Sequence, residues 1–177
     1  MGGVLHTVNT RLFDEQLVYI INHAEDRVLL FDAMFLPIVE RLRSQLARVE
    51  HFILFDAPAR DGYLSYRDLI DAEDGSFAWV ELDERDPVGL CYTSGTTGNP
   101  KGVLYEHRSN VIHAITEIQP DVFDMSNRSV ILPIVPMFHA NSWGIPFAAA
   151  TVGAKLVFSA TNDAQVLCDL MRDEGVT

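Results

Sequence analysis

The residues best suited to chemistry in this chain form a run of small and polar side chains at residues 92–102, which read Tyr-Thr-Ser-Gly-Thr-Thr-Gly-Asn-Pro-Lys-Gly. The run directly follows an apolar segment at residues 88–91. Glycines let the backbone turn tightly and bring its N–H groups close to an anion, hydroxyl groups add further donors, and Lys101 supplies a positive charge. The pattern therefore predicts a loop that binds phosphate, with a nucleoside triphosphate as the expected ligand.

This run differs from the Walker A loop, which ends in Gly-Lys-Ser/Thr. Here Lys101 lies between Pro100 and Gly102, so the hydroxyl that usually binds Mg²⁺ in a Walker A loop is missing. The alternative interpretation is a plain Gly/Thr turn between a strand and a helix. The lysine in this setting favours the phosphate-binding interpretation.

The same eleven residues resemble, almost letter for letter, the signature loop of the adenylate-forming superfamily. This superfamily includes acyl- and aryl-CoA synthetases, luciferases and the adenylation domains of peptide synthetases. The resemblance implies that the loop holds the β- and γ-phosphates of ATP while a carboxylic acid attacks the α-phosphate, giving an acyl-adenylate that coenzyme A then captures. It implies ATP, Mg²⁺ and coenzyme A as co-substrates. The residues that it assigns to the ATP phosphates are Thr93, Ser94, Gly95, Thr96, Thr97, Gly98 and Lys101.

A second segment, residues 136–147, resembles the stretch that lines the acyl pocket in fatty acyl-CoA synthetases; it reads Pro-Met-Phe-His-Ala-Asn-Ser-Trp-Gly-Ile-Pro-Phe. A helix that begins at Asn141 as its N-cap would keep His139 and Trp143 close together. The resemblance implies that His139 borders the carboxylate of the acid and that Trp143 gates the acyl tunnel. The alternatives are a structural histidine and a core tryptophan.

Residues 2–12 resemble, more weakly, the family segment that precedes a short helix, and Thr10 or Asn9 is expected to cap that helix. The resemblance thus spans the whole chain, although later family motifs are missing: Tyr-Gly-x-Thr-Glu, Thr-Gly-Asp and a C-terminal catalytic lysine. We therefore expect an internal piece of the large domain, without the small C-terminal domain. We expect it to be inactive alone, and we assign no catalytic residue within it.

Composition excludes several other classes of function. With 13 basic and 25 acidic residues, the net charge of −12 argues against nucleic acid and anionic membranes as partners. Cys91 and Cys168 lie in apolar segments without metal-ligand spacing, which predicts free, buried thiols in a reducing compartment and no metal site. No signal peptide or apolar run of about 18 residues is present, so we expect a cytoplasmic protein. Whether it forms a homodimer stays open.

The elements that must position these segments alternate between strands and helices. Apolar residues recur at helical spacing from Phe13 to Ala24, and residues 28–31 predict a buried strand. A second helix with an apolar face from Phe35 to Leu46 and a strand at residues 51–55 complete a parallel βαβ unit. Asp32 and Asp56, at the strand ends, are expected to be capping or loop carboxylates rather than catalytic ones.

Residues 57–87 are turn-rich and acidic and predict a boundary between a first βαβ lobe, residues 1–86, and a phosphate-loop and acyl-pocket lobe, residues 87–177. Beyond the loop, Val111, Ile112, Ile115 and Ile118 predict a helix that starts near Glu106. On this helix, His107 and His113 are expected to be surface or packing residues. Strands at residues 130–135 and 155–158 and a helix from Asp163 to Arg172 follow.

The expected fold class is α/β, with mostly parallel sheets, flanking helices and ligands near the carboxyl ends of the strands. The expected function is part of an ATP-dependent acyl-CoA ligase that acts on a fatty or similar acyl acid. An aryl-CoA ligase or another adenylating enzyme is the alternative within the class. A non-catalytic nucleotide-binding module is the alternative from another class.

Overall fold

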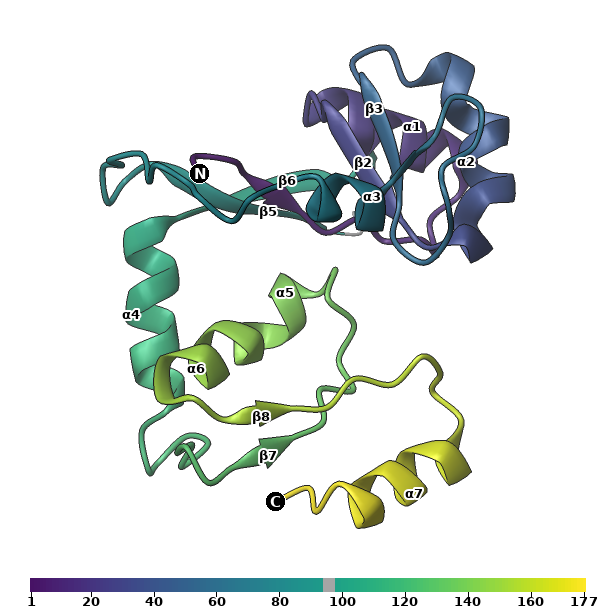
Figure 1. Ribbon diagram of the computed structural model, residues 1–177. Coiled ribbons are helices and arrows are strands. Elements are labelled where there is room, and N and C mark those ends of the chain that lie inside the picture. The colour runs from purple at the N-terminus through teal and green to yellow at the C-terminus, as the bar shows by residue number, and fades with distance from the viewer. Residues whose placement is uncertain (94–97) are drawn as a thin grey trace. The chain divides into compact units, whose positions relative to one another are not determined.

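The computed structural model describes residues 1–93 and 98–177 (Figure 1). Parallel strand pairs occur alongside helices, so the predicted α/β class is confirmed. The chain forms two compact units. Unit 1 comprises Met1, Val8–Val80 and Tyr92–Gly102, and unit 2 comprises Gly2–Thr7, Glu81–Cys91 and Val103–Thr177.

Unit 1 is built around two parallel strands, β2 (Val28–Phe31) and β3 (His51–Leu54), which pair from Val28 opposite His51 to Phe31 opposite Leu54. The helix α2 (Leu36–Leu42) connects them, and this confirms the predicted βαβ unit. Short 3₁₀ turns flank α2 on both sides, η1 (Ala33–Phe35) and η2 (Arg43–Gln45). After β3 come β4 (Leu64–Ser65), which is parallel to it, and the helix α3 (Tyr66–Asp71).

The hydrophobic core of unit 1 joins the apolar faces of α1 (Asp14–His23), α2 and the two strands. The spacing of its members in α1 matches the predicted helical period. The buried core residues are Leu17, Ile20, Ile21, Phe31, Val39, Leu42, Leu46, Phe52, Leu54 and Tyr63. Beside this core, the Ala33 N–H donates to Asp56 Oδ1 at 2.6 Å, so Asp56 is the loop carboxylate that the sequence predicts.

The start of α1 differs from the prediction. Its N-cap residue is Phe13, and the Phe13 N–H donates to the side-chain oxygen of Gln16 at 3.3 Å. The Asn9 side chain instead accepts from the Arg11 N–H at 3.0 Å, in the turn before the helix. The expectation that Asn9 or Thr10 caps α1 is therefore wrong, because this local side-chain bond stabilises a separate turn ahead of the helix.

β1 (Leu5–His6) lies in unit 2 and is parallel to β5 (Pro87–Thr93), and β6 (Lys101–Glu106) is the other neighbour of β5. The end of β5 from Tyr92 and the start of β6 up to Gly102 belong to unit 1, and the rest of both strands belongs to unit 2. Helix α4 (His107–Glu117) follows β6 directly, with Glu106 at its N-cap, which confirms the predicted start. In Figure 1, α6 lies beside α4, and β7 and β8 run next to each other. The remaining elements are β7 (Val130–Ile131), α5 (Ala140–Trp143), α6 (Ile145–Val152), β8 (Lys155–Leu156) and α7 (Ala164–Asp173).

Helix α4 packs on α6 through small side chains. Ala114 of α4 meets Ala148 and Ala149 of α6, together with Met125. Three of the four apolar residues that predicted this helix face outward instead: Val111, Ile112 and Ile115 are each about half exposed, whereas Ile118 packs against the core. The buried side of α4 carries Ala114 and Glu117, so apolar periodicity identified the helix but not its buried side.

Three predictions about unit 2 need correction. The strand expected at residues 130–135 ends at Ile131, before Pro133, whose missing N–H cannot join a ladder, and β8 likewise ends at Leu156. Cys91 is buried, as predicted, but Cys168 is exposed, and both thiols are free.

Among the described residues, no helix has the length and apolar character needed to cross a bilayer.

Candidate functional site

The two described ends of the predicted phosphate loop meet at a strand pair. Thr93 is the last residue of β5, and Lys101 is the first residue of β6. The Thr93 hydroxyl donates to the Lys101 carbonyl oxygen at 3.4 Å, so the base of the loop is closed by a side chain of the loop itself. The other predicted phosphate-binding residues on the loop's first part lie outside the described residues; they are Ser94, Gly95, Thr96 and Thr97.

The second part of the loop suits an approaching anion. Gly98 has a φ of 114°, a conformation that favours glycine, and a Cβ atom there would meet no atom of a described residue within 4 Å. Lys101 is exposed and forms no ion pair with any described residue. No Asp or Glu occurs between Asp86 and Glu106, although the chain has a net charge of −12. An otherwise acidic protein thus leaves this segment with one unopposed positive charge.

The predicted acyl-pocket segment contains a left-handed turn. Ala140, Asn141, Ser142 and Trp143 have φ angles of 46°, 53°, 57° and 58°, and Gly144 follows at 82°. Left-handed conformation costs roughly 1–2 kcal/mol for each non-glycine residue, so this turn needs support from the rest of unit 2. The prediction that Asn141 caps a right-handed helix is therefore wrong. That helix is α6, and Gly144 occupies its N-cap.

Side chains from distant parts of unit 2 hold the first half of the turn. The Ser142 hydroxyl is completely buried and donates to the Val135 carbonyl oxygen at 2.7 Å. Asn141 is also buried, and its Oδ1 accepts from the Thr7 hydroxyl at 3.1 Å and from the Cys91 thiol at 3.6 Å. Since Cys91 lies in β5, this strand is one of the supports of the turn.

Close packing against β5 also explains a glycine. A Cβ atom at Gly89 would lie 3.2 Å from the Asn141 amide nitrogen. A larger residue at this position of β5 would therefore push against the side chain that anchors the turn.

The turn brings together the backbones of the two residues predicted to meet the acid. The Trp143 N–H donates to the His139 carbonyl oxygen at 3.2 Å. Trp143 is 55% exposed, which does not fit the core alternative, and the His139 ring is exposed beside Phe138 at a centroid distance of 4.7 Å. The two residues thus share one turn, although by a different backbone path from the predicted helix.

The second half of the turn meets a pair of residues that the sequence did not single out for function. His113 Nε2 lies 3.0 Å from the Trp143 carbonyl oxygen and 3.3 Å from Glu117 Oε1. Glu117 is 4% exposed, and burial raises its pKa above the ordinary value of 4.5, while the nearby His113 opposes that shift. A His and a Glu four residues apart on a helix were the available signal, but such a pair is usually a surface feature.

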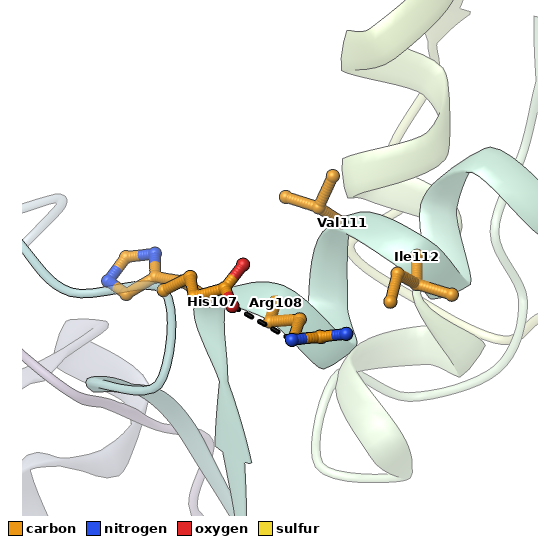
Figure 2. A pocket seen from close by; sticks show the side chains of 5 residues that line it. His107, Arg108, Val111 and Ile112 are labelled. Atoms are coloured by element: carbon orange, nitrogen blue, oxygen red, sulfur yellow. Dashed lines mark hydrogen bonds and ion pairs between the residues drawn. The ribbon is translucent and has the colours of Figure 1, made fainter.

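A pocket of about 380 Å³ lies at the start of α4. His107, Arg108, Val111 and Ile112 line it, and Figure 2 shows the ion pair of Arg108, whose partner Glu84 lies 2.8 Å away. The pocket contains none of the residues that the sequence predicts to bind ATP or acid. It therefore adds nothing to the candidate site.

The chain belongs to the family described as AMP-binding enzyme, whose family model matches residues 1–177. The resemblance inferred from the loop and from the segment around Trp143 is thereby confirmed. It also explains why the Gly- and hydroxyl-rich run after β5 departs from a Walker A loop.

Curated relatives show how much of such a protein this chain represents. It is 50% identical to a medium-chain-fatty-acid–CoA ligase of Ectopseudomonas oleovorans over 99% of the chain and 34% of the relative. It is 49% identical to a 3-methylmercaptopropionyl-CoA ligase of Ruegeria lacuscaerulensis over the same shares. The chain therefore spans about a third of the length of these relatives.

A solved structure supports the same fold. The crystal structure of the anthranilate CoA ligase AuaEII in complex with anthranoyl-AMP matches 96% of this chain and 33% of its own chain, with a TM-score of 0.82 and 26% identity. The strands, helices and connections described above are thus those of an adenylate-forming enzyme.

Proposed function

We propose that this chain forms part of the large domain of an ATP-dependent acyl-CoA ligase. In the first step, a carboxylate oxygen of the acid attacks the α-phosphorus of ATP, the bond to pyrophosphate breaks, and an acyl-adenylate forms. In the second step, the sulfur of coenzyme A attacks the acyl carbon and AMP leaves, so that the product is a thioester. The observation that carries the proposal is the 50% identity, over 99% of the chain, to a fatty-acid–CoA ligase.

The loop between β5 and β6 has the chemistry to hold the pyrophosphate end of ATP. Thr93 and Lys101 sit at its base, and Gly98 leaves open space for a close approach of the backbone to an anion. We assign to Lys101 the stabilisation of the negative charge that develops on the departing pyrophosphate. A lysine stabilises such charge most where no carboxylate competes for it. Ser94, Gly95, Thr96 and Thr97 belong to the same proposed site by sequence alone.

The left-handed turn is the proposed acid side of the site. It presents the exposed side chains of His139 and Trp143, which we assign to the carboxylate end and the acyl path of the acid. The proposed substrate is a fatty or similar short acyl acid. The relatives at 49–50% identity are named for a medium-chain fatty acid and for 3-methylmercaptopropionate, both of which have flexible, unbranched acyl chains.

Mg²⁺ and coenzyme A are further proposed co-substrates. The described residues include no group of three His, Cys, Asp or Glu side chains that could hold a metal ion, so this part of the chain does not fit a magnesium ligand set. Two free thiols, Cys91 and Cys168, are compatible with a reducing cytoplasm, which we propose as the location.

The test is pyrophosphate release by the full-length protein that carries this chain, measured with ATP and a panel of acids. The panel holds straight-chain acids from two to sixteen carbons, 3-methylmercaptopropionate, benzoate and anthranilate. We expect release only with an acid present, and fastest with one of the straight-chain acids. Absence of release with every acid, by a protein that binds ATP, would instead indicate a nucleotide-binding module.

An aryl-CoA ligase is the second candidate, favoured by the structural match to an anthranilate CoA ligase. Its sequence identity of 26% is about half of that to the fatty-acid relative. Preference for benzoate or anthranilate over all straight-chain acids would establish this alternative and remove the proposed role of an acyl path beside Trp143.

A further inference from the structure

Glu117 is the starting point, because it is a carboxyl group buried in unit 2 without full hydrogen bonding. One oxygen, Oε1, lies 3.3 Å from His113 Nε2, and the other, Oε2, has no hydrogen-bond partner among the described residues. Burial of a carboxyl group costs free energy unless hydrogen bonds or an opposite charge compensate for the lost water. Among the described residues, the ring of His113 is its only neighbour at ion-pair distance.

The geometry determines which nitrogen of His113 carries a proton. Nε2 faces the Trp143 carbonyl oxygen at 3.0 Å, and a carbonyl oxygen can only accept a hydrogen bond. Nε2 must therefore be the protonated nitrogen and must donate to Trp143. Glu117, one helical turn further along α4, lies where its carboxyl restricts the orientation of the ring.

The contact lies at the end of the left-handed turn, where the other anchors do not reach. Asn141 and Ser142 hold the first half of the turn through Thr7, Cys91 and Val135. At the second half, Gly144 comes so close to α4 that a Cβ atom there would lie 2.6 Å from the His113 ring and 2.9 Å from Glu117 Oε2. Gly144 thus permits the approach that the hydrogen bond to Trp143 needs.

We propose that His113, oriented by Glu117, is a positioning residue that fixes the backbone of Trp143, aims its indole, and so contributes to the choice of acid. This inference rests on the proposed function of the full-length protein. The imidazole itself does not touch the acid; it acts through the Trp143 carbonyl group. Loss of the Nε2–H donor therefore frees the end of the turn while the anchors at Asn141 and Ser142 stay in place.

The first experiment uses two variants of the full-length protein, His113→Leu and His113→Gln. Leucine has a similar size but no donor, whereas glutamine offers an amide N–H at a similar distance from the backbone. For His113→Leu, we expect the ratio of kcat/KM values for a long and a short acid to change about 3- to 10-fold, the range that one net hydrogen bond can produce. The KM for ATP should change less than about 2-fold, and His113→Gln should restore the ratio.

The matched control is His107→Leu, which replaces a half-buried histidine of α4, six positions earlier and without a side-chain bond to the turn. It should leave the ratio unchanged. An active wild type whose acid ratio is the same in His113→Leu would overturn the proposal, as would a loss in His113→Leu that is uniform across all acids and accompanied by a lower melting temperature.

A second experiment does not depend on activity. The full-length protein is labelled with 5-fluorotryptophan, and the ¹⁹F resonance of Trp143 is identified by its disappearance in Trp143→Phe. We expect this resonance to shift or broaden in His113→Leu and in Glu117→Gln, and to keep its position in His107→Leu. An unchanged Trp143 resonance in both variants would contradict the proposal, whether or not the wild type activates an acid. A shifted resonance in a protein that activates no acid would count against the proposed function alone.

Discussion

The loop between β5 and β6 and the left-handed turn from Ala140 to Gly144 differ in what gives them their structure. In the loop, the residue types carry the chemistry: glycines, hydroxyls and Lys101 lie in one short run, and its described ends are joined by Thr93. In the turn, contacts with residues outside it stabilise the conformation, since Thr7, Val135 and His113 each bond one of its residues.

This difference separates two kinds of mutational effect. If the loop binds ATP as proposed, a substitution there removes a phosphate contact, so it should change the rate and leave the fold intact. A substitution in or under the turn changes where a side chain points, so it should change stability or the choice of acid. The experiments below test this division.

The largest effect is expected for Lys101→Ala in the full-length protein. Loss of the lysine charge, which we propose stabilises the departing pyrophosphate anion, should cost about 2–4 kcal/mol, or roughly 30- to 1,000-fold in kcat/KM for ATP. The melting temperature should stay within a degree or so, because Lys101 makes no ion pair with any described residue. Lys155→Ala, which removes a lysine paired with Glu174, is the control; equal effects of the two variants would show that Lys101 does not meet ATP.

The next largest effect concerns stability and compares two glycines with similar backbones. Gly153 has a φ of 73° and open space around it, so Gly153→Ala should cost only about 1–2 kcal/mol of left-handed strain. Gly144 has a φ of 82° and faces His113 and Glu117, so Gly144→Ala should cost about 1–3 kcal/mol more through overpacking. Urea unfolding measures both; equal losses would mean that α4 does not press on the turn.

Trp143→Ala should act on the acid rather than on the fold. Since Trp143 is 55% exposed, its truncation should cost less than the roughly 3–5 kcal/mol typical of a buried tryptophan. A hydrophobic pocket discriminates by about 1–3 kcal/mol per methylene, so the expected result is a graded shift along a series of straight-chain acids. A large drop in melting temperature with equal losses for every acid would assign Trp143 to a core.

The smallest expected effect is a pH dependence at Glu117. Burial raises its pKa above 4.5, so the folded state holds this proton more tightly than the unfolded state does. The stability that results is present below pH 4.5 and is lost as the pH rises through the folded pKa. Glu117→Gln stays neutral, so the wild type should lose stability relative to this variant as the pH rises above 4.5. Urea unfolding at several pH values measures this, with a substitution of the exposed Glu73, Glu73→Gln, as the control. A difference in unfolding free energy between the wild type and Glu117→Gln that stays constant with pH would contradict the prediction.

Much of the fold follows from patterns within short segments. Apolar spacing from Phe13 to Ala24 predicted α1, and two buried runs separated by a helix predicted the parallel pairing of β2 and β3. The residue types after β5 likewise indicated the family. These features depend on neighbours in the sequence, and a single chain displays them directly.

The features that sequence reasoning missed depend on neighbours in space. The sequence around Asn141 does not by itself predict a left-handed turn, because the bonds that compensate for its strain come from Thr7, just after β1, and from Cys91 in β5. The apolar residues of α4 pointed to the wrong buried side, since the helix packs through Ala114 and buries Glu117. His113 was therefore expected to be only a surface or packing residue.

The most direct test of the division between loop and turn measures two quantities in Lys101→Ala and Trp143→Ala. These are the KM for ATP and the ratio of kcat/KM values for a long and a short acid. We predict that Lys101→Ala changes the use of ATP equally with every acid and leaves the acid ratio unchanged. We predict that Trp143→Ala changes the acid ratio and leaves the KM for ATP unchanged. An acid ratio altered by Lys101→Ala, together with an unaltered ratio in Trp143→Ala, would contradict the division between loop and turn.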